Sequence, residues 1–119
     1  MSELIRVDPA TVRRWLAEGD TVLIDVRGAA EHAREHIAGA RLMPLPELDA
    51  AALPAGKRIV LCCASGCRSK TAARRLGLDG LAHLEGGIAA WIEAGFPVVS
   101  MQSSHFTAML NFGSPTQLA

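Results

Sequence analysis

Short apolar runs alternate with segments of mixed polarity along most of the chain. Residues 21–26 and 58–62 are nearly continuous apolar runs, which is typical of strands buried on both faces of a sheet. Shorter strands are predicted at 4–7, 41–43 and 81–84. Strands that alternate with helices on short connections predict an α/β fold, an open parallel sheet of about five strands with helices on both faces.

Helix signals lie between these strands. Asp8 supplies an N-cap, Pro9 suits the first helical turn, and Gly19 ends that helix, in which Trp15 is a core residue. Further helices are predicted at 29–36, 45–52, 69–78 and from Gly87 onward, the last containing the core residue Trp91 and ending before Gly95 and Pro97.

The pattern changes near the C-terminus. Residues 100–119 are rich in Ser, Thr and Gln, with isolated apolar residues such as Phe106 and Leu110. We therefore expect a domain at 1–99 and a C-terminal tail at 100–119, whose apolar residues leave room for a homodimer.

Composition narrows the function classes. Twelve basic residues balance twelve acidic ones, so no nucleic-acid or membrane-surface partner is expected. The three cysteines, all between Cys62 and Cys67, form no disulfide framework and favour a reducing compartment. With no signal peptide or membrane span in the sequence, the expected location is the cytoplasm.

Cys63 is the main candidate for chemistry. It follows the apolar run 58–62 and precedes a short polar loop and a helix start, so backbone N–H groups should converge beyond its sulfur. Such donors, with the positive helix end and Arg68, bind anions and lower a thiol pKa. A Cys63 side chain packed into the interior would argue against this role. The residues expected to bind the anion are Ala64, Ser65, Gly66, Cys67, Arg68 and Ser69.

The other two cysteines have different expected roles. Cys62 falls inside the strand and is expected to pack in the core. Cys67 is either a small exposed residue that tunes donor preference or a resolving thiol for Cys63. No second cysteine pair exists, so no zinc site or other metal site is expected.

Asp25 and Arg27 end a strand at the same sheet edge as Cys63. They could line the pocket, but a structural ion pair is the stronger expectation. His32 and His36 lie four residues apart and resemble a metal pair. With no third ligand nearby in sequence, we interpret both as structural hydrogen-bonding residues.

Several motifs in order resemble the single-domain rhodanese family. They are residues 23–27 with Glu31, His32, His36 and Ile37; Cys63-x-Ser65-Gly66-x-Arg68-Ser69; and Leu84-x-Gly86-Gly87-x3-Trp91. The resemblance extends over residues 5–99 and leaves out the tail.

This resemblance implies a sulfurtransferase. The Cys63 thiolate would take a sulfane sulfur from an anionic donor such as thiosulfate and hold it as a persulfide. Cyanide, a small thiol or a protein cysteine would then accept the sulfur. Arg68 would contact the donor anion, and no cofactor is required.

Two alternatives remain open at this stage. A cysteine-dependent phosphatase or arsenate reductase uses a similar loop with five residues between Cys and Arg. That spacing holds if the loop begins at Cys62, whereas only four residues separate Cys63 from Arg68. The second alternative is a rhodanese-like sulfur carrier or binding module with no turnover of its own.

Overall fold

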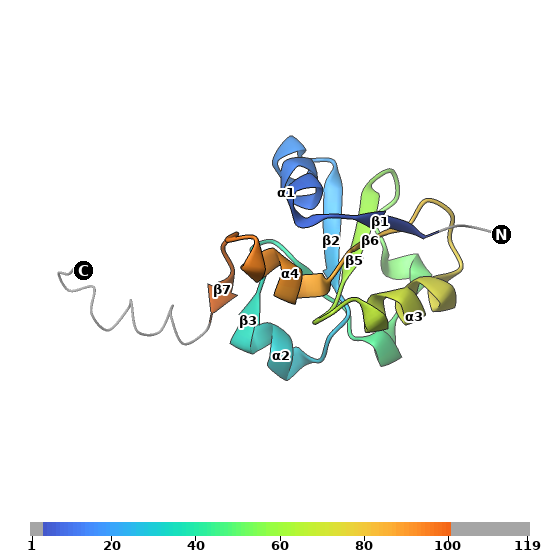
Figure 1. Ribbon diagram of the computed structural model, residues 1–119. Coiled ribbons are helices and arrows are strands. Elements are labelled where there is room, and N and C mark those ends of the chain that lie inside the picture. The colour runs from blue at the N-terminus through green and yellow to red at the C-terminus, as the bar shows by residue number, and fades with distance from the viewer. Residues whose placement is uncertain (1–3, 101–119) are drawn as a thin grey trace, which may run out of the picture.

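The computed structural model describes residues 4–100. At its centre is a five-stranded parallel sheet with the strand order β1-β6-β5-β2-β4 (Figure 1). This arrangement confirms the predicted fold class. The strands are β1 (Ile5–Val7), β2 (Thr21–Asp25), β4 (Arg41–Leu42), β5 (Arg58–Cys62) and β6 (Ala82–Leu84).

Within residues 4–100, four α-helices connect the strands, and their ends follow local sequence signals. The helices are α1 (Pro9–Glu18), α2 (Ala29–Arg34), α3 (Cys67–Leu76) and α4 (Gly87–Glu93). The Asp8 carboxylate accepts the Thr11 N–H at 2.9 Å at the start of α1, as its N-cap position predicts. Helix α3 begins two residues before the predicted start and ends at Leu76, where the C-cap residue Gly77 has a left-handed φ of 60°.

The helix predicted at 45–52 is wrong. Two short 3₁₀ turns, η1 (Leu45–Glu47) and η2 (Ala50–Ala52), stand in its place. Pro46 disfavours an α conformation at the residue before it, and Leu48 is extended, with φ −60° and ψ 135°. The Asp49 carboxylate then accepts the Ala51 N–H at 3.0 Å and starts a new turn.

Segment 29–36 is helical only in its first part. Helix α2 ends at Arg34, and β3 (Glu35–His36) pairs antiparallel with β7 (Val99–Ser100), a second small sheet that the apolar pattern did not indicate. Ser100 therefore still pairs with the domain. The rest of the predicted tail, and the dimer expected from it, lie outside the described residues.

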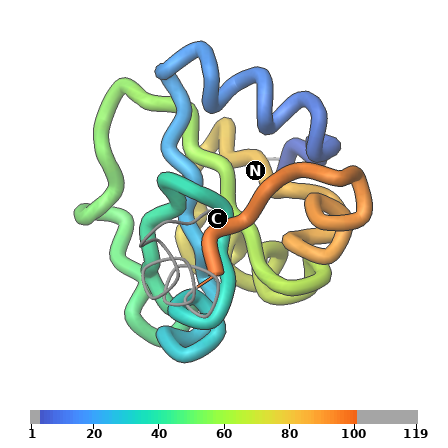
Figure 2. The backbone as a smooth tube through the Cα atoms, turned by 90° about the vertical axis from the view of Figure 1, so that its left-hand side faces the viewer, coloured from blue at the N-terminus to red at the C-terminus, as the bar shows by residue number. Residues whose placement is uncertain are grey.

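Two apolar clusters cover the two faces of the sheet. On one face, Val12 of α1 and Trp91 of α4 pack with Val60 and Cys62. On the other face, Ala72 of α3 and the segment around Leu48 pack with Leu61 and Cys63. Figure 2 shows α4 in orange and the green segment before β5 on opposite sides of the sheet. Since successive strand residues face opposite sides, Cys62 and Cys63 belong to different clusters.

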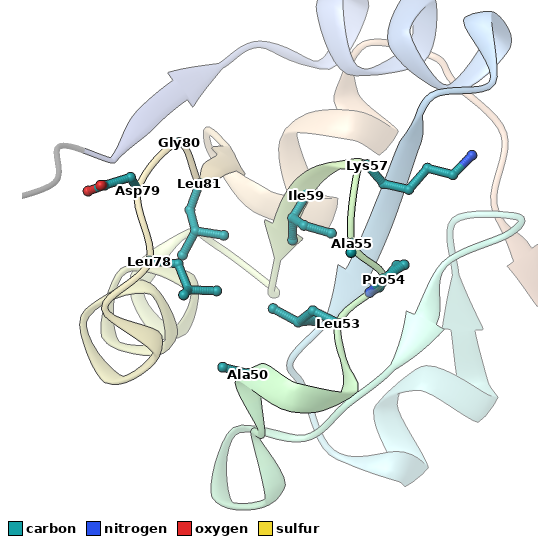
Figure 3. Close-up of a pocket in the computed structure, with 10 residues that line it drawn as sticks. All are labelled: Ala50, Leu53, Pro54, Ala55, Lys57, Ile59, Leu78, Asp79, Gly80 and Leu81. Atoms are coloured by element: carbon teal, nitrogen blue, oxygen red, sulfur yellow. The ribbon is translucent and has the colours of Figure 1, made fainter.

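A cavity of about 370 Å³ lies between the start of β5 and the turn before β6 (Figure 3). Its wall includes Leu53, Ile59, Leu78 and Leu81. Figure 3 shows the charged ends of Lys57 and Asp79 directed away from it. The cavity lies toward the amino ends of the strands, whereas Cys63 follows the carboxyl end of β5, so it is separate from the candidate site.

Among residues 4–100, no helix has the length and the apolar character needed to cross a membrane.

Candidate functional site

Strand β5 ends at Cys62, which is the partner of Asp25 in the parallel register with β2. The Cys62 side chain is fully buried, and burial, followed by the nearby charge of Asp25, raises its thiol pKa well above the ordinary value of 9.0. The loop therefore begins at Cys63, with four residues between Cys63 and Arg68. This register is the one on which the sulfurtransferase interpretation depends.

The sulfur of Cys63 lies inside the loop that follows β5. The Gly66 N–H donates to Sγ at 2.9 Å, and the Ser69 hydroxyl oxygen lies 3.8 Å away. Burial alone would raise the pKa of the Cys63 thiol. Hydrogen bonds from Ser69 and from the amides of Gly66 and Ser65 outweigh that effect and hold the pKa below 9.0. The loop thus favours the thiolate.

Cys63 is also deeply placed, with 1% of the residue exposed. This burial counts against ready access, and on its own it would suit a structural cysteine. Two features distinguish Cys63 from the equally buried Cys62, namely the amide that donates to its sulfur and the opposite direction of its pKa shift.

The first turn of α4 binds the loop after β5 through backbone hydrogen bonds. The N–H of Ile88 donates to the Cys63 carbonyl at 2.9 Å, and the N–H of Ala89 donates to the Ala64 carbonyl at 3.1 Å. These bonds satisfy two amides of the first helical turn and fix two loop carbonyls on the α4 side. One peptide further along the loop, the Gly66 amide points at the sulfur.

Gly87 permits this close approach. A Cβ atom at Gly87 would lie 2.4 Å from the Cys63 carbonyl oxygen and 2.6 Å from the Ala64 carbonyl carbon, and the residue has φ +65°. Both the space and the backbone conformation therefore require glycine. The Gly-Gly pair noted in the sequence thus positions the cysteine loop.

Arg68, in the first turn of α3, forms a bidentate ion pair with Glu31 of α2. The two N–H···O distances are 2.8 and 2.9 Å. Hydrogen bonding by Arg68 and by the Gly28 amide lowers the pKa of Glu31 from 4.5 to about 2. The sequence predicts that Arg68 contacts a substrate anion, and in the structure two of its five guanidinium N–H groups bind the Glu31 carboxylate.

Asp25 and Arg27 form a buried ion pair behind the loop. The Arg27 Nη2 and Asp25 Oδ2 atoms are 2.8 Å apart, and the same nitrogen donates to the Glu35 carbonyl. His32 Nδ1 lies 2.8 Å from Asp25. Burial would raise the pKa of Asp25, but the bonds from Arg27 and His32 lower it overall. These groups connect β2 to α2 and do not contact the Cys63 sulfur.

The two histidines of the α2 region have structural contacts. Their rings stack at a centroid distance of 3.9 Å, and His36 Nδ1 lies 2.8 Å from the His32 carbonyl oxygen. Within residues 4–100, no group of three or more His, Cys, Asp or Glu side chains is arranged to hold a metal ion.

Sequence reasoning found no role for His83, but the structure places it at the site. His83 lies on β6 with 1% exposure, and its Nδ1 is 2.8 Å from the Ser69 hydroxyl oxygen. No sequence motif joins residues 14 positions apart on a strand and a helix. Cys67 is exposed, and the nature of its role stays a prediction.

A family model described as a rhodanese-like domain matches residues 8–94. The chain belongs to this family. Its fold agrees with a rhodanese-related protein from Thermoplasma volcanium, at a TM-score of 0.73 and 30% identity, covering 80% of this chain and 97% of that one.

Two relatives of this rhodanese-like domain carry sulfurtransferase names. A sulfurtransferase from Allochromatium vinosum is 33% identical over 79% of this chain and 94% of its own length. The probable adenylyltransferase/sulfurtransferase MoeZ of Mycobacterium tuberculosis is 38% identical over 71% of this chain. The chain spans 24% of MoeZ and 62% of a Synechocystis protein that is 36% identical to it, so it matches only part of these longer relatives.

We predict that Gly87→Ala destabilises the rhodanese-like domain through its contact with the loop. Gly77→Ala is the matched control, because Gly77 has φ +60° with nothing within 4 Å of an added Cβ. Both variants carry similar strain from their left-handed backbone. The free energy of unfolding should therefore fall by about 1–3 kcal/mol more for Gly87→Ala than for Gly77→Ala, because of overpacking. Urea unfolding measures this free energy. An equal decrease for the two variants would show that the contact does not constrain the loop.

The Glu31–Arg68 pair predicts a pH dependence of stability. The Glu31 pKa is about 2 in the folded protein and near 4.5 when unfolded, so its stabilisation is complete above pH 4.5 and declines as the pH falls toward 2. Because both side chains are partly exposed, we expect Glu31→Gln to cost about 1 kcal/mol or less at pH 7.

The difference in unfolding free energy between wild type and Glu31→Gln should be smaller at pH 3 than at pH 7. Glu93→Gln, on an exposed part of α4 for which the described residues show no ion pair, serves as the control. A difference between wild type and Glu31→Gln that stays constant from pH 7 to pH 3 would contradict the expected linkage.

Proposed function

We propose that this rhodanese-like domain transfers a sulfane sulfur from a small anionic donor, thiosulfate or a similar compound, to a thiophilic acceptor. The observation that carries the proposal is the Cys63 sulfur, held 2.9 Å from the Gly66 amide at a pKa below that of an ordinary thiol. The thiolate is the nucleophilic form of cysteine, and the same amide can stabilise a persulfide anion.

The reaction has two displacement steps. In the first, the Cys63 thiolate attacks the outer sulfur of thiosulfate, the S–S bond of the donor breaks, and sulfite leaves with the electron pair. This leaves a persulfide on Cys63. In the second, cyanide, a small thiol or a protein cysteine attacks the terminal sulfur, and the Cys63 thiolate is the leaving group. Neither step needs a metal ion or an organic cofactor.

The depth of Cys63 bears on donor size. With 1% of the residue exposed, the sulfur is reached more easily by a slender donor with a terminal sulfur than by a bulky one. A six-residue loop from Cys63 to Arg68 is also smaller than the loop expected for phosphate. Both features favour sulfane sulfur over a phosphoryl group.

Arg68 is proposed to contact the donor with the N–H groups that Glu31 leaves unused. The guanidinium has five N–H groups, and the bidentate pair uses two of them. Glu31 reduces the positive potential available to an anion, so it moderates the attraction of Arg68 for a dianionic donor. The backbone amides supply the remaining contacts.

The setting proposed for this chemistry is a reducing one. All three cysteines, Cys62, Cys63 and Cys67, are free, which suits the cytoplasm. The acceptor is proposed to be a thiol or cyanide, and the longer relatives leave room for an acceptor on another domain or another protein.

The first test is the intact mass of the protein after thiosulfate treatment. Wild type should gain one sulfur atom and Cys63→Ser none. Cys62→Ser is the control, because Cys62 is buried on the opposite face of β5 and should affect stability more than sulfur loading.

Loading that survives in Cys63→Ser and is lost in Cys62→Ser would overturn the loop register. No gain with any sulfane donor would favour a binding module without turnover. Hydrolysis of p-nitrophenyl phosphate without sulfur transfer from thiosulfate to cyanide would favour a phosphatase.

The charges at the loop predict opposite effects of two substitutions. Arg68→Ala should raise the KM for thiosulfate about tenfold, equivalent to roughly 1.4 kcal/mol. Glu31→Gln should lower that KM, roughly two- to fivefold, because it keeps a hydrogen bond to Arg68 but removes a partly exposed negative charge. Steady-state kinetics measure both, with Glu93→Gln as the control. A raised KM in Glu31→Gln would mean that the ion pair supports donor binding.

A further inference from the structure

The hydroxyl of Ser69 lies beside the sulfur of Cys63 and has three polar neighbours. Its oxygen lies 3.8 Å from Cys63 Sγ, 3.0 Å from the Gly66 carbonyl oxygen and 2.8 Å from His83 Nδ1. The hydroxyl has one proton and two lone pairs, so it can donate to only one of these neighbours. Whichever group donates to Ser69 decides whether that proton is available to the sulfur.

His83 enters this network from the neighbouring strand. It lies on β6, next to Leu61 of β5 in the parallel register, and its ring reaches Ser69 of α3. The ring is buried, with 1% of the residue exposed. Burial and the positive charge of Lys70 lower the pKa of His83 below 6.5, so the ring is neutral at pH 7.

The surroundings of Nε2, the second ring nitrogen of His83, indicate which nitrogen of the neutral ring carries the proton. Nε2 of His83 is buried, and no hydrogen-bond partner for it exists among residues 4–100. A buried N–H without an acceptor is costlier than a buried lone pair without a donor, and orphaned N–H groups are the rarer case. The favoured tautomer therefore carries its proton on Nδ1, from where it donates to the Ser69 oxygen.

We propose that His83 is a positioning residue that, by donating to the Ser69 oxygen, leaves the Ser69 proton free to turn toward the sulfur of Cys63. In the thiol form, Ser69 donates to the Gly66 carbonyl. In the thiolate form, the same proton turns to Sγ, so that the Ser69 hydroxyl donates to the sulfur alongside the backbone amides of the loop. With the opposite tautomer, Ser69 would donate to the ring and have no proton for the sulfur.

This inference states which group donates in the hydrogen bond between His83 and Ser69. Its importance for function rests on the proposed role of Cys63. Its tests measure the tautomer of His83 and the pKa of the Cys63 thiol, and neither test depends on sulfur transfer. A protein without sulfurtransferase activity can therefore still pass them, and the two proposals can fail separately.

The direct test is the tautomer of His83 in the wild-type protein. Two-bond ¹H–¹⁵N correlation spectra at pH 7 distinguish the two neutral forms. We expect the Nδ1–H form. Because the spectra are recorded on the wild-type protein, the result does not depend on whether a variant folds. The Nε2–H form would overturn the proposal.

The second test measures the reactivity of Cys63 with iodoacetamide as a function of pH, in a Cys67→Ser background that removes the exposed thiol. His83→Gln and His83→Asn are a matched pair of neutral polar variants. The Asn amide can occupy the place of Nδ1 and donate to Ser69, whereas the Gln amide extends toward the place of Nε2. We expect His83→Gln to raise the apparent thiol pKa by about half a unit, a threefold change in the equilibrium, and His83→Asn to retain the wild-type value.

The effect should act through Ser69. In a Ser69→Ala background, His83→Gln should therefore cause no further change in the thiol pKa. An equal shift with and without the Ser69 hydroxyl would overturn the proposal, and so would an unchanged pKa in folded His83→Gln.

Discussion

The contact between the first turn of α4 and the loop after β5 determines the geometry of the candidate site. Two amides, those of Ile88 and Ala89, bind the carbonyls of Cys63 and Ala64. With these carbonyls fixed on the α4 side, the following Gly66 amide can point at the sulfur. Gly87 is required at the contact because its backbone lies where a side chain would meet the loop. The cysteine loop and the distant Gly-Gly motif are therefore two halves of one structural element.

Both arginines near the site are neutralised by carboxylates. Arg27 pairs with buried Asp25 behind the loop, and Arg68 pairs with Glu31 at its side. Charge compensation leaves the stabilisation of a sulfur anion largely to main-chain N–H groups and to the Ser69 hydroxyl. Such donors are fixed in place by the fold and need no counterion, which suits a small loop around one sulfur atom.

The sequence predicts the parallel sheet, the position of Cys63 after β5 and the core location of Cys62, because these follow from local apolar patterning. It does not predict contacts between distant residues. The Glu31–Arg68 pair joins residues 37 positions apart, and the Ser69–His83 bond joins a helix to the next strand. The helix predicted at 45–52 is wrong because helical propensity in the alanine-rich segment is overridden by Pro46 and an extended Leu48.

The central claim is that the loop holds a negatively charged sulfur on Cys63. A crystal structure of the wild-type protein after treatment with thiosulfate tests it most directly. The account predicts density for one extra sulfur bonded to Cys63 Sγ, within hydrogen-bonding distance of loop N–H groups. Extra sulfur on Cys67 instead, or an unmodified Cys63 still packed at 1% exposure, would contradict it.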